Sequence, residues 1–365
     1  MNHQAKRFFY MIVDLFQLDK AIVFILLALG AINLLVQYSA SDRNIAYLIN
    51  DGIYLLISFV VLFIIGNLNL NHLKSMAIPI YILSIILLIS VIFFGISVNG
   101  AKRWLNIGIR IQPSELSKLA VPLMLTYYFS LKNQGITWLN YIAAFILLLI
   151  PFILIAKQPD LGTGILVLTS GCFVLFFAGI SWRMIIAVIC LFLFSTPIIW
   201  HFLHDYQRSR IFTLINPQSD PLGKGYHIIQ GMIAIGSGGL WGKGYLHGTQ
   251  THLNFIPEKN TDFVITVLSE EFGYIGVCVI LMLYIMLIFR CLNIAFSAED
   301  IFSRVLAASI TMSFMLYILI NMGMVAGIFP VVGVPLPLIS YGGTATIVLM
   351  AGFGILLAIN RQNKY

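Results

Sequence analysis

The sequence has little charge: Asp, Glu, Lys and Arg make up 10% of its 365 residues, whereas 60% are hydrophobic. A water-soluble domain of this length cannot bury so much apolar surface, so that class of protein is excluded. The 4 cysteines lie inside apolar runs, without the spacing of metal ligands or of a disulfide framework. Because the sequence also lacks an internal repeat and a second soluble domain, we expect a single integral membrane domain over residues 1–365.

Long apolar runs are what the sequence has in abundance. Bilayer hydrocarbon requires about 20 apolar residues per helical span, and lipid offers backbone groups no hydrogen-bond partner, so the spans should be helices. The runs and their breakers predict an all-α polytopic membrane protein with about ten transmembrane helices. These are expected at residues 21–39, 47–66, 76–96, 115–131, 139–156, 162–180, 183–200, 271–294, 303–326 and 340–360.

The termini favour one orientation in the membrane. Both are basic, and an even number of spans puts them on one side, which the positive-inside rule makes the cytoplasm. The large loop at residues 201–261 is then extracytoplasmic. A simple tally of Lys and Arg does not decide the topology, because the outer loops hold more of these residues than the inner ones.

The outer cations lie mainly in two loops, 98–113 and 201–261, which are dense in Gly, Pro, Asn and aromatic residues. Lys and Arg are usually depleted from outer loops, so their presence here predicts a surface that binds an anion such as a pyrophosphate. Anionic lipid head groups are the alternative ligand. The glycines have neither Rossmann nor P-loop spacing, so a nucleotide site is rejected. They instead let the backbone approach a ligand closely.

The first loop leads through Pro113 into a helix. Pro113 suits the first helical position, which puts Glu115 in the opening turn and Lys118 on the same face. Charged side chains within a span must face the bundle interior or water. Glu115 and Lys118 are therefore candidates for contacting a substrate, and a purely structural ion pair explains them equally well.

Two aspartates follow helix breakers. Asp160 comes after Pro159 in residues 157–163, KQPDLGT, where it either caps the sixth span or acts as a functional carboxylate. Asp262 stands where the long loop enters an apolar stretch that, as one helix to residue 295, would be about 50 Å long and must project or re-enter. Asp262 would then lie at a helix N-terminus, next to Asn260 or Thr261 as the cap. A helix N-terminus and a nearby cation favour an ionised carboxylate, so Asp262 is predicted to be a general base, and a helix cap is the alternative.

Two further polar features lie near spans. Glu270 and Glu271 are adjacent carboxylates where the eighth span begins, and we expect one of them to face a polar cavity. Residues 330–344, PVVGVPLPLISYGGT, break the chain just before the tenth span and should re-enter the membrane or line the cavity.

Five segments in this order carry a resemblance that covers nearly the whole chain. The chain is similar to the SEDS family of shape, elongation, division and sporulation proteins, and the end of the chain, PLPLISYGGTA at 335–345, resembles its elongation branch more than its division branch. Asn260 departs from the family, which more often has His there. The segments are GAKRWL at 100–105, QPSELSK at 112–118, KQPDLGT at 157–163, GSGGL at 236–240 and TDF at 261–263.

The resemblance implies a ten-span glycosyltransferase of the bacterial cytoplasmic (inner) membrane that polymerises lipid II. It makes Asp262 the catalytic base, and it implies a class B penicillin-binding transpeptidase and other elongation proteins as partners, besides membrane lipids, with no role for nucleic acid. No cofactor is firmly implied, and a divalent cation stays open. A flippase or transporter and a non-catalytic scaffold are the alternatives. The candidate substrate-binding residues are Lys102, Arg103, Glu115, Lys118, Asp160, Arg208 and Arg210.

Overall fold

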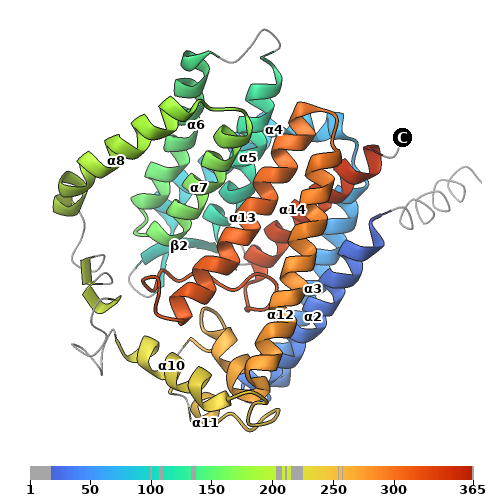
Figure 1. The fold of residues 1–365 in the computed structure, drawn as a ribbon, viewed down its shortest axis with the longest axis vertical. Coiled ribbons are helices and arrows are strands. Elements are labelled where there is room, and N and C mark those ends of the chain that lie inside the picture. The colour runs from blue at the N-terminus through green and yellow to red at the C-terminus, as the bar shows by residue number, and fades with distance from the viewer. Residues whose placement is uncertain are drawn as a thin grey trace, which may run out of the picture.

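The fold was analysed in a computed structural model, which describes residues 18–98, 101–106, 108, 110–132, 137–202, 208–209, 212–214, 225–253, 255–256 and 258–363. Helices run mostly along one direction and form a bundle (Figure 1). The helices are α2 (Lys20–Ala40), α3 (Ile45–Gly66), α4 (Leu70–Phe94), α5 (Pro113–Ser130), α6 (Trp138–Ala156), α7 (Leu161–Phe177), α8 (Trp182–Phe202), α10 (Tyr226–Gly238), α11 (Thr249–His252), α12 (Val264–Ser297), α13 (Ile301–Val325) and α14 (Gly343–Gln362).

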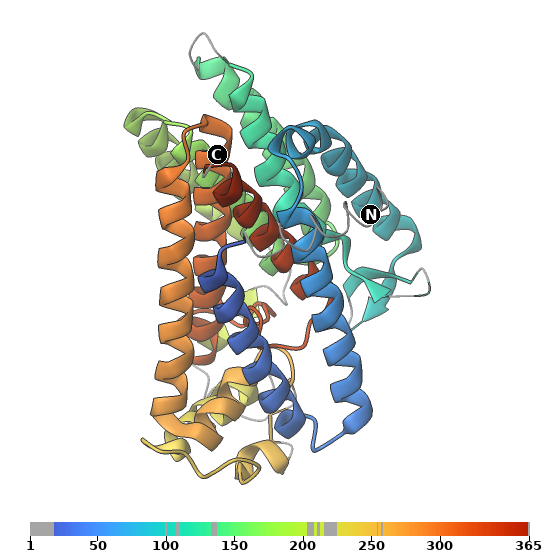
Figure 2. The ribbon, with the colours of Figure 1, turned by 90° about the vertical axis from the view of Figure 1, so that its right-hand side faces the viewer.

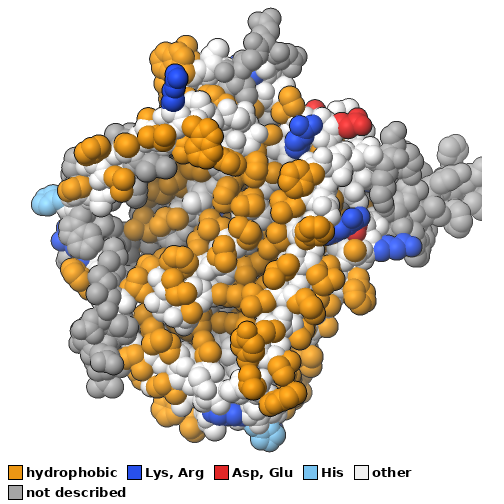
Figure 3. Space-filling model, viewed as in Figure 1, with side chains coloured by type: hydrophobic (Ala, Val, Ile, Leu, Met, Phe, Trp, Pro, Cys, Tyr) orange, Lys and Arg blue, Asp and Glu red, His pale blue; other side chains and the backbone are white. Residues whose placement is uncertain are grey.

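Each of the ten predicted spans overlaps one of these helices, and the prediction of a helical polytopic membrane protein is confirmed. Among the described residues, seven helices are long and apolar enough to cross a membrane: α2, α3, α4, α6, α12, α13 and α14. The face shown in Figure 3 is largely apolar, with charged side chains mostly near its edges. Such a surface is suited to lipid, because no water-soluble protein leaves so large an apolar area exposed.

The ends of the described chain meet at one face of the bundle. Asp19, just before α2, accepts hydrogen bonds from Arg290 at 2.8 Å and from Asn360 near the end of α14 at 3.1 Å. The helices α10 and α11 lie at the opposite end of the bundle from the C-terminus in both views (Figures 1 and 2). The helices α10 and α11 of the large loop therefore lie on the opposite side from the described ends of the chain.

A small sheet in the first polar loop was missed by the sequence reasoning. Strands β1 (Ile96–Val98), β2 (Ala101–Asn106) and β3 (Arg110–Ile111) form an antiparallel sheet in that order, with Ser97 opposite Lys102. Strands β1 and β3 have only 3 and 2 residues, and the 6 residues of β2, AKRWLN, do not alternate between apolar and polar. The sheet fixes the cations of this loop at the start of α5.

The long helix α12 changes direction at Gly273, which has φ +65° and ψ −163°. A Cβ at this position would lie 2.3 Å from the backbone nitrogen of Gly242, so the close approach of the two chains also requires glycine. The nine residues before Gly273 thus form a separate helical piece. A straight helix of 34 residues would be longer than the bilayer is thick, so a change of direction near its start is expected.

Candidate functional site

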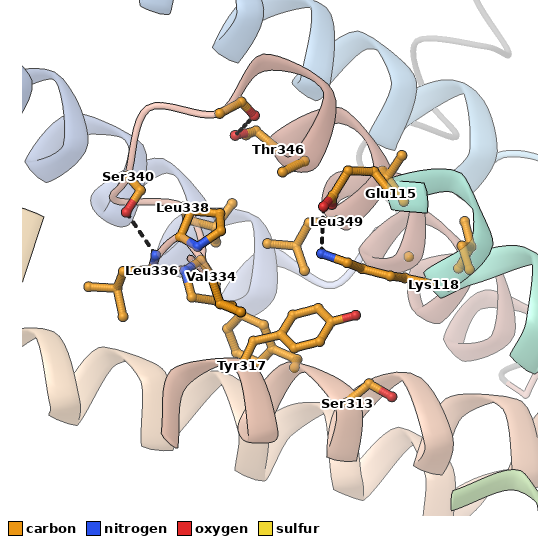
Figure 4. Close-up of a pocket in the computed structure, with 18 of the residues that line it drawn as sticks. Glu115, Lys118, Ser313, Tyr317, Val334, Leu336, Leu338, Ser340, Thr346 and Leu349 are labelled. Carbon is orange, nitrogen blue, oxygen red and sulfur yellow. Dashed lines mark hydrogen bonds and ion pairs between the residues drawn. The ribbon is translucent and has the colours of Figure 1, made fainter. Parts of the chain in front are cut away.

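A pocket that is partly open to the outside lies between α5, α13, α14 and the irregular segment before α14. Most of its lining is apolar, from residues such as Leu119, Phe314 and Leu349. Glu115 and Lys118 enter it from α5 (Figure 4). An apolar pocket with a few polar groups is typical of a ligand site, and here it suits an amphipathic molecule.

The predicted pairing of Glu115 with Lys118 is present. The Lys118 ammonium donates to Glu115 Oε1 at 2.6 Å, and the two side chains are only 8% and 7% exposed. The Lys118 nitrogen also lies 4.9 Å from the ring centre of Tyr317 on α13. Burial strengthens the attraction of this cation for any anion that enters the pocket, although Glu115 already neutralises it.

Asp262 lies on a turn before α12 that is tied to the segment lining the pocket. Asn321 of α13 donates from Nδ2 to the carbonyl oxygens of Asp262 at 2.9 Å and of Val334 at 2.7 Å. The Ser340 hydroxyl donates to the carbonyl of Thr261. These bonds hold the backbone of Asp262 in place without using its carboxylate.

The carboxylate of Asp262 faces the same strip of chain that borders the pocket. Its Oδ2 lies 3.4 Å from the point where a Cβ on Gly333 would be, and Gly333 has φ +75°. The next residue, Val334, lines the pocket. Asp262 is partly exposed, so a substrate group beside Gly333 can reach it.

The predicted capping of α12 is wrong. The helix begins at Val264, its N-cap is Phe263, and no side chain caps it. The Thr261 hydroxyl donates instead to Glu258 at 2.9 Å within the turn. Asp262 therefore stands near the helix start but does not act as its cap.

Asp160, by contrast, caps helix α7, which was one of the two alternatives predicted for it. It is 2% exposed and its carboxylate accepts from the Thr163 amide of α7 at 3.4 Å. Gln112 donates to it at 3.0 Å, and the Arg103 guanidinium lies 3.7 Å away while donating to the carbonyl of Pro159 at 2.9 Å. A substrate contact by Asp160 stays a prediction beside this capping role.

The Asp160 cluster borders the same strip of chain as Asp262. A Cβ on Gly162 would lie 2.5 Å from the carbonyl oxygen of Val332, so α7 packs tightly there. In the strip at residues 332–334, Val332 contacts the start of α7, Gly333 lies beside Asp262, and Val334 lines the pocket. Residues distant in the sequence converge on this strip.

Lys102 and Arg208 are not among the residues that line the pocket. Lys102 is exposed on β2. Arg208 donates to the carbonyl of His201 at the end of α8, at 2.8 Å. Arg210 lies outside the described residues. In the part of the chain described, no cluster of three or more His, Cys, Asp or Glu side chains could hold a metal ion.

Sequence reasoning missed the residues that assemble the site, above all Asn321, Ser340 and Gln37. Gln37 of α2 donates from Nε2 to the carbonyls of Asn260 at 2.9 Å and Ile339 at 3.0 Å. Asn321 and Gln37 are amides within apolar spans, and a polar residue in such a span usually has a specific partner. That signal was available in the sequence.

We expected either Glu270 or Glu271 to face a polar cavity. Both are instead buried, at 0% and 1% exposure, and neither lines the pocket. Glu270 accepts from the Lys243 ammonium at 2.7 Å, and from the amide and hydroxyl of Thr251 at 3.1 and 2.9 Å. Glu271 accepts from the Ser39 hydroxyl. The Glu270 carboxylate therefore anchors the outer loop to α12, and the Glu271 carboxylate joins α12 to α2.

Glu270→Gln should lower the free energy of unfolding by about 1.5–3 kcal/mol, because hydrogen bonds to a charged acceptor lose strength when the charge is removed. Thermal unfolding of the purified chain in detergent measures the loss. Glu299→Gln, which changes an exposed glutamate beyond the end of α12, is the matched control and should leave stability almost unchanged. Equal melting temperatures for the two variants would contradict this anchoring role.

Lys259, three residues before Asp262, ties the turn to the α2–α3 connection. Its ammonium donates to Asp42 at 2.8 Å and to the carbonyl of Thr251 at 3.0 Å. Burial by itself would raise the pKa of Asp42, but hydrogen bonds from Lys259 and His252 outweigh it and lower that pKa below 3.8. The stabilisation is therefore present at neutral pH and is lost as the pH falls through the lowered pKa.

Comparison with known proteins places this geometry in context. The sequence pattern of a family described as "Cell cycle protein" (FtsW, RodA, SpoVE) matches residues 14–365. The chain is 49% identical over 360 residues to the peptidoglycan glycosyltransferase MrdB of Escherichia coli K12, covering 96% of this chain and 95% of that protein.

Two solved structures have a similar fold. A chain of a peptidoglycan synthase complex that coordinates polymerization and crosslinking matches with a TM-score of 0.82 and 29% identity, over 95% of this chain and 98% of that one. The rod shape determining protein RodA of Thermus thermophilus matches with a TM-score of 0.72 and 27% identity, over the same shares of the two chains. Both therefore cover nearly all of the bundle.

Proposed function

The chain belongs to the cell cycle protein family of FtsW, RodA and SpoVE, the SEDS family, and we propose that it is a peptidoglycan glycosyltransferase that polymerises lipid II with Asp262 as general base. The observation that carries the function is the 49% identity to MrdB over almost the whole chain. The elongation branch follows from this likeness to MrdB and from the fold shared with RodA. Lateral cell-wall growth is accordingly its process.

The proposed reaction requires one base and one stabilised leaving group. Asp262 accepts the proton of the acceptor sugar's 4-hydroxyl, whose oxygen attacks the anomeric carbon of the donor. The bond from that carbon to the undecaprenyl pyrophosphate oxygen breaks, and the pyrophosphate leaves with the electron pair and inversion at carbon. No carboxylate nucleophile is needed, in contrast to retaining glycoside hydrolysis.

The surroundings of Asp262 support this role. The partly exposed carboxylate lies beside Gly333, and the adjoining pocket has an apolar lining and holds the Lys118 ammonium. An apolar lining suits the polyprenyl part of the substrate, and a buried cation suits its pyrophosphate. Further cations and polar groups proposed to contact the sugar or pyrophosphate are Lys102, Arg103, Glu115, Asp160, Arg208 and Arg210.

The proposed setting is the bacterial inner membrane, with both termini in the cytoplasm and the loop at 201–261 outside. The described ends of the chain share one face of the bundle, which supports an even number of spans. The proposed partner is a class B penicillin-binding transpeptidase. The similarity to a chain of a complex that coordinates polymerization and crosslinking supports this partner.

Polymerisation of purified lipid II tests the function. The chain, reconstituted with its transpeptidase partner and supplied with labelled lipid II, should form long glycan strands. A gel separates these strands by length. Failure to form polymer while lipid II moves between leaflets of protein-containing vesicles would favour a flippase. Failure in both assays with partner binding retained would favour a scaffold.

A further inference from the structure

Three polar side chains are buried where α2 and α3 pack together, inside spans that are otherwise apolar. Asn33 and Gln37 of α2 are 2% and 0% exposed, and Asp51 of α3 is 4% exposed. Asn33 and Gln37 are four residues apart, so they lie on one face of α2. Asp51 lies six residues after the start of α3, which is about 9 Å along the helix axis. Asn33 lies at a similar distance before the end of α2, so the two residues are at about the same level in the bundle.

The oxygens of this group lack hydrogen-bond partners within the described protein. Unpaired are Asn33 Oδ1, Gln37 Oε1 and Asp51 Oδ2, together with Oδ1 of the neighbouring Asn260. The side chains of Asn33 and Asp51 lie within interaction range of each other. The amide nitrogen of Gln37 is already used by the carbonyls of Asn260 and Ile339, so Gln37 has only its oxygen left to offer.

A carboxylate in this position needs a positive partner. Asp51 forms no ion pair with any Lys, Arg or His in the described part of the chain, and the nearby groups that interact with it electrostatically include the phenols of Tyr47 and Tyr341. An ionised carboxylate left alone inside a span is costly, and ionisable groups kept in a span usually mark a functional site. Carboxylate and amide oxygens without hydrogen-bond partners, such as these, are the ligands that a hard cation prefers.

We propose that Asp51, Asn33 and Gln37, with Asn260 at the edge, form a binding site for one alkali metal cation, Na⁺ or K⁺. The single carboxylate balances one positive charge, and the other ligands are neutral amide oxygens. Ca²⁺ and Mg²⁺ sites usually hold more carboxylates or several waters, which does not suit one Asp within a buried contact. This site is separate from the pocket, and it does not depend on the proposed glycosyltransfer.

The position of the site gives the cation a structural task. Gln37 links α2 to the turn at residues 258–263 and to the segment before α14 through its bonds to Asn260 and Ile339. The amide of Tyr341 also donates to the Asn260 carbonyl, at 3.0 Å. A cation held by Asp51 on α3 would therefore join α3 to the same junction. Binding should stabilise the folded chain, because the unfolded chain has no such site.

Thermal unfolding of the full-length chain in detergent tests the site. The ionic strength is held constant with choline chloride while NaCl or KCl replaces it. The melting temperature of the wild type should rise saturably with one of these cations, whereas Asp51→Asn should show no rise. Asn33→Leu should raise the half-effect concentration about tenfold, since a lost ligand weakens binding without removing the charge.

Asp300→Asn is the matched control, because Asp300 is an aspartate half-exposed at the end of the bundle and paired with Lys74 at 2.9 Å. It should keep the full response to the cation. Binding of radioactive ²²Na⁺ or ⁸⁶Rb⁺ to the wild type, at one ion per chain, tests the site even if Asp51→Asn fails to fold. A wild type that ignores both cations and binds neither, or an Asp51→Asn protein that responds as the wild type does, would overturn the proposal in favour of a protonated Asp51.

Discussion

Asp262→Asn is expected to lower the rate of glycan polymerisation by about 10²–10⁴-fold, the usual contribution of a general base. The amide has the size of the carboxylate but cannot take the proton of the attacking hydroxyl. Folding should be almost unaffected, because the turn is held through the carbonyls of Asp262 and Thr261, which the substitution leaves in place. Polymer formed from labelled lipid II over time measures the rate, and thermal unfolding measures the stability.

Glu258→Gln is the control for charge in the same turn. Glu258 is exposed and lies four residues before Asp262, and its carboxylate accepts from the Thr261 hydroxyl. Its carbonyl accepts from the amides of Thr261 and Phe263, which the substitution leaves in place. Removing its charge should change the rate far less than Asp262→Asn does. If both variants slowed polymerisation equally, the negative charge of the turn would matter and proton transfer to Asp262 would be rejected. Polymerisation by Asp262→Asn at the wild-type rate would have the same consequence.

The membrane spans could be predicted from the sequence because each span needs its own run of about 20 apolar residues, whatever the rest of the chain does. The pairing of Glu115 with Lys118 was also local, since three residues along one helix bring side chains to one face. Asp160 followed a proline, so its cap could be named as one of two alternatives. Each of these features depends on residues within a few positions of one another.

The assembly of the site could not be predicted in the same way. Gln37 reaches Asn260 across 223 positions of sequence, and Asn321 joins Asp262 to Val334. Such contacts depend on the packing of several helices, which no local pattern encodes. The break at Gly273 has a similar origin. Glycine occurs elsewhere in the apolar spans, and here it is required by the positive φ and by the approach of Gly242.

Lys118→Met is expected to lower the free energy of unfolding by about 3–5 kcal/mol, because it leaves the Glu115 carboxylate buried without its partner. Glu115→Gln should also destabilise the chain, since it leaves the Lys118 ammonium alone. The double variant, Glu115→Gln with Lys118→Met, removes both charges from a site where each side chain is less than 10% exposed. Most of the lost stability should return, as it does when a buried ion pair is replaced by well-packed neutral groups.

Polymerisation by this double variant separates the two interpretations of the pair. If the pair is only structural, restored folding restores the rate as well. If Lys118 holds the pyrophosphate, the folded double variant should polymerise lipid II about 10²–10³-fold more slowly, the usual loss when one group that stabilises developing charge is removed. We expect the slow rate, because Lys118 is the cation lining the pocket in the described residues and the leaving pyrophosphate carries the charge that the reaction creates. A double variant that is both stable and fast would assign Glu115 and Lys118 to the fold alone.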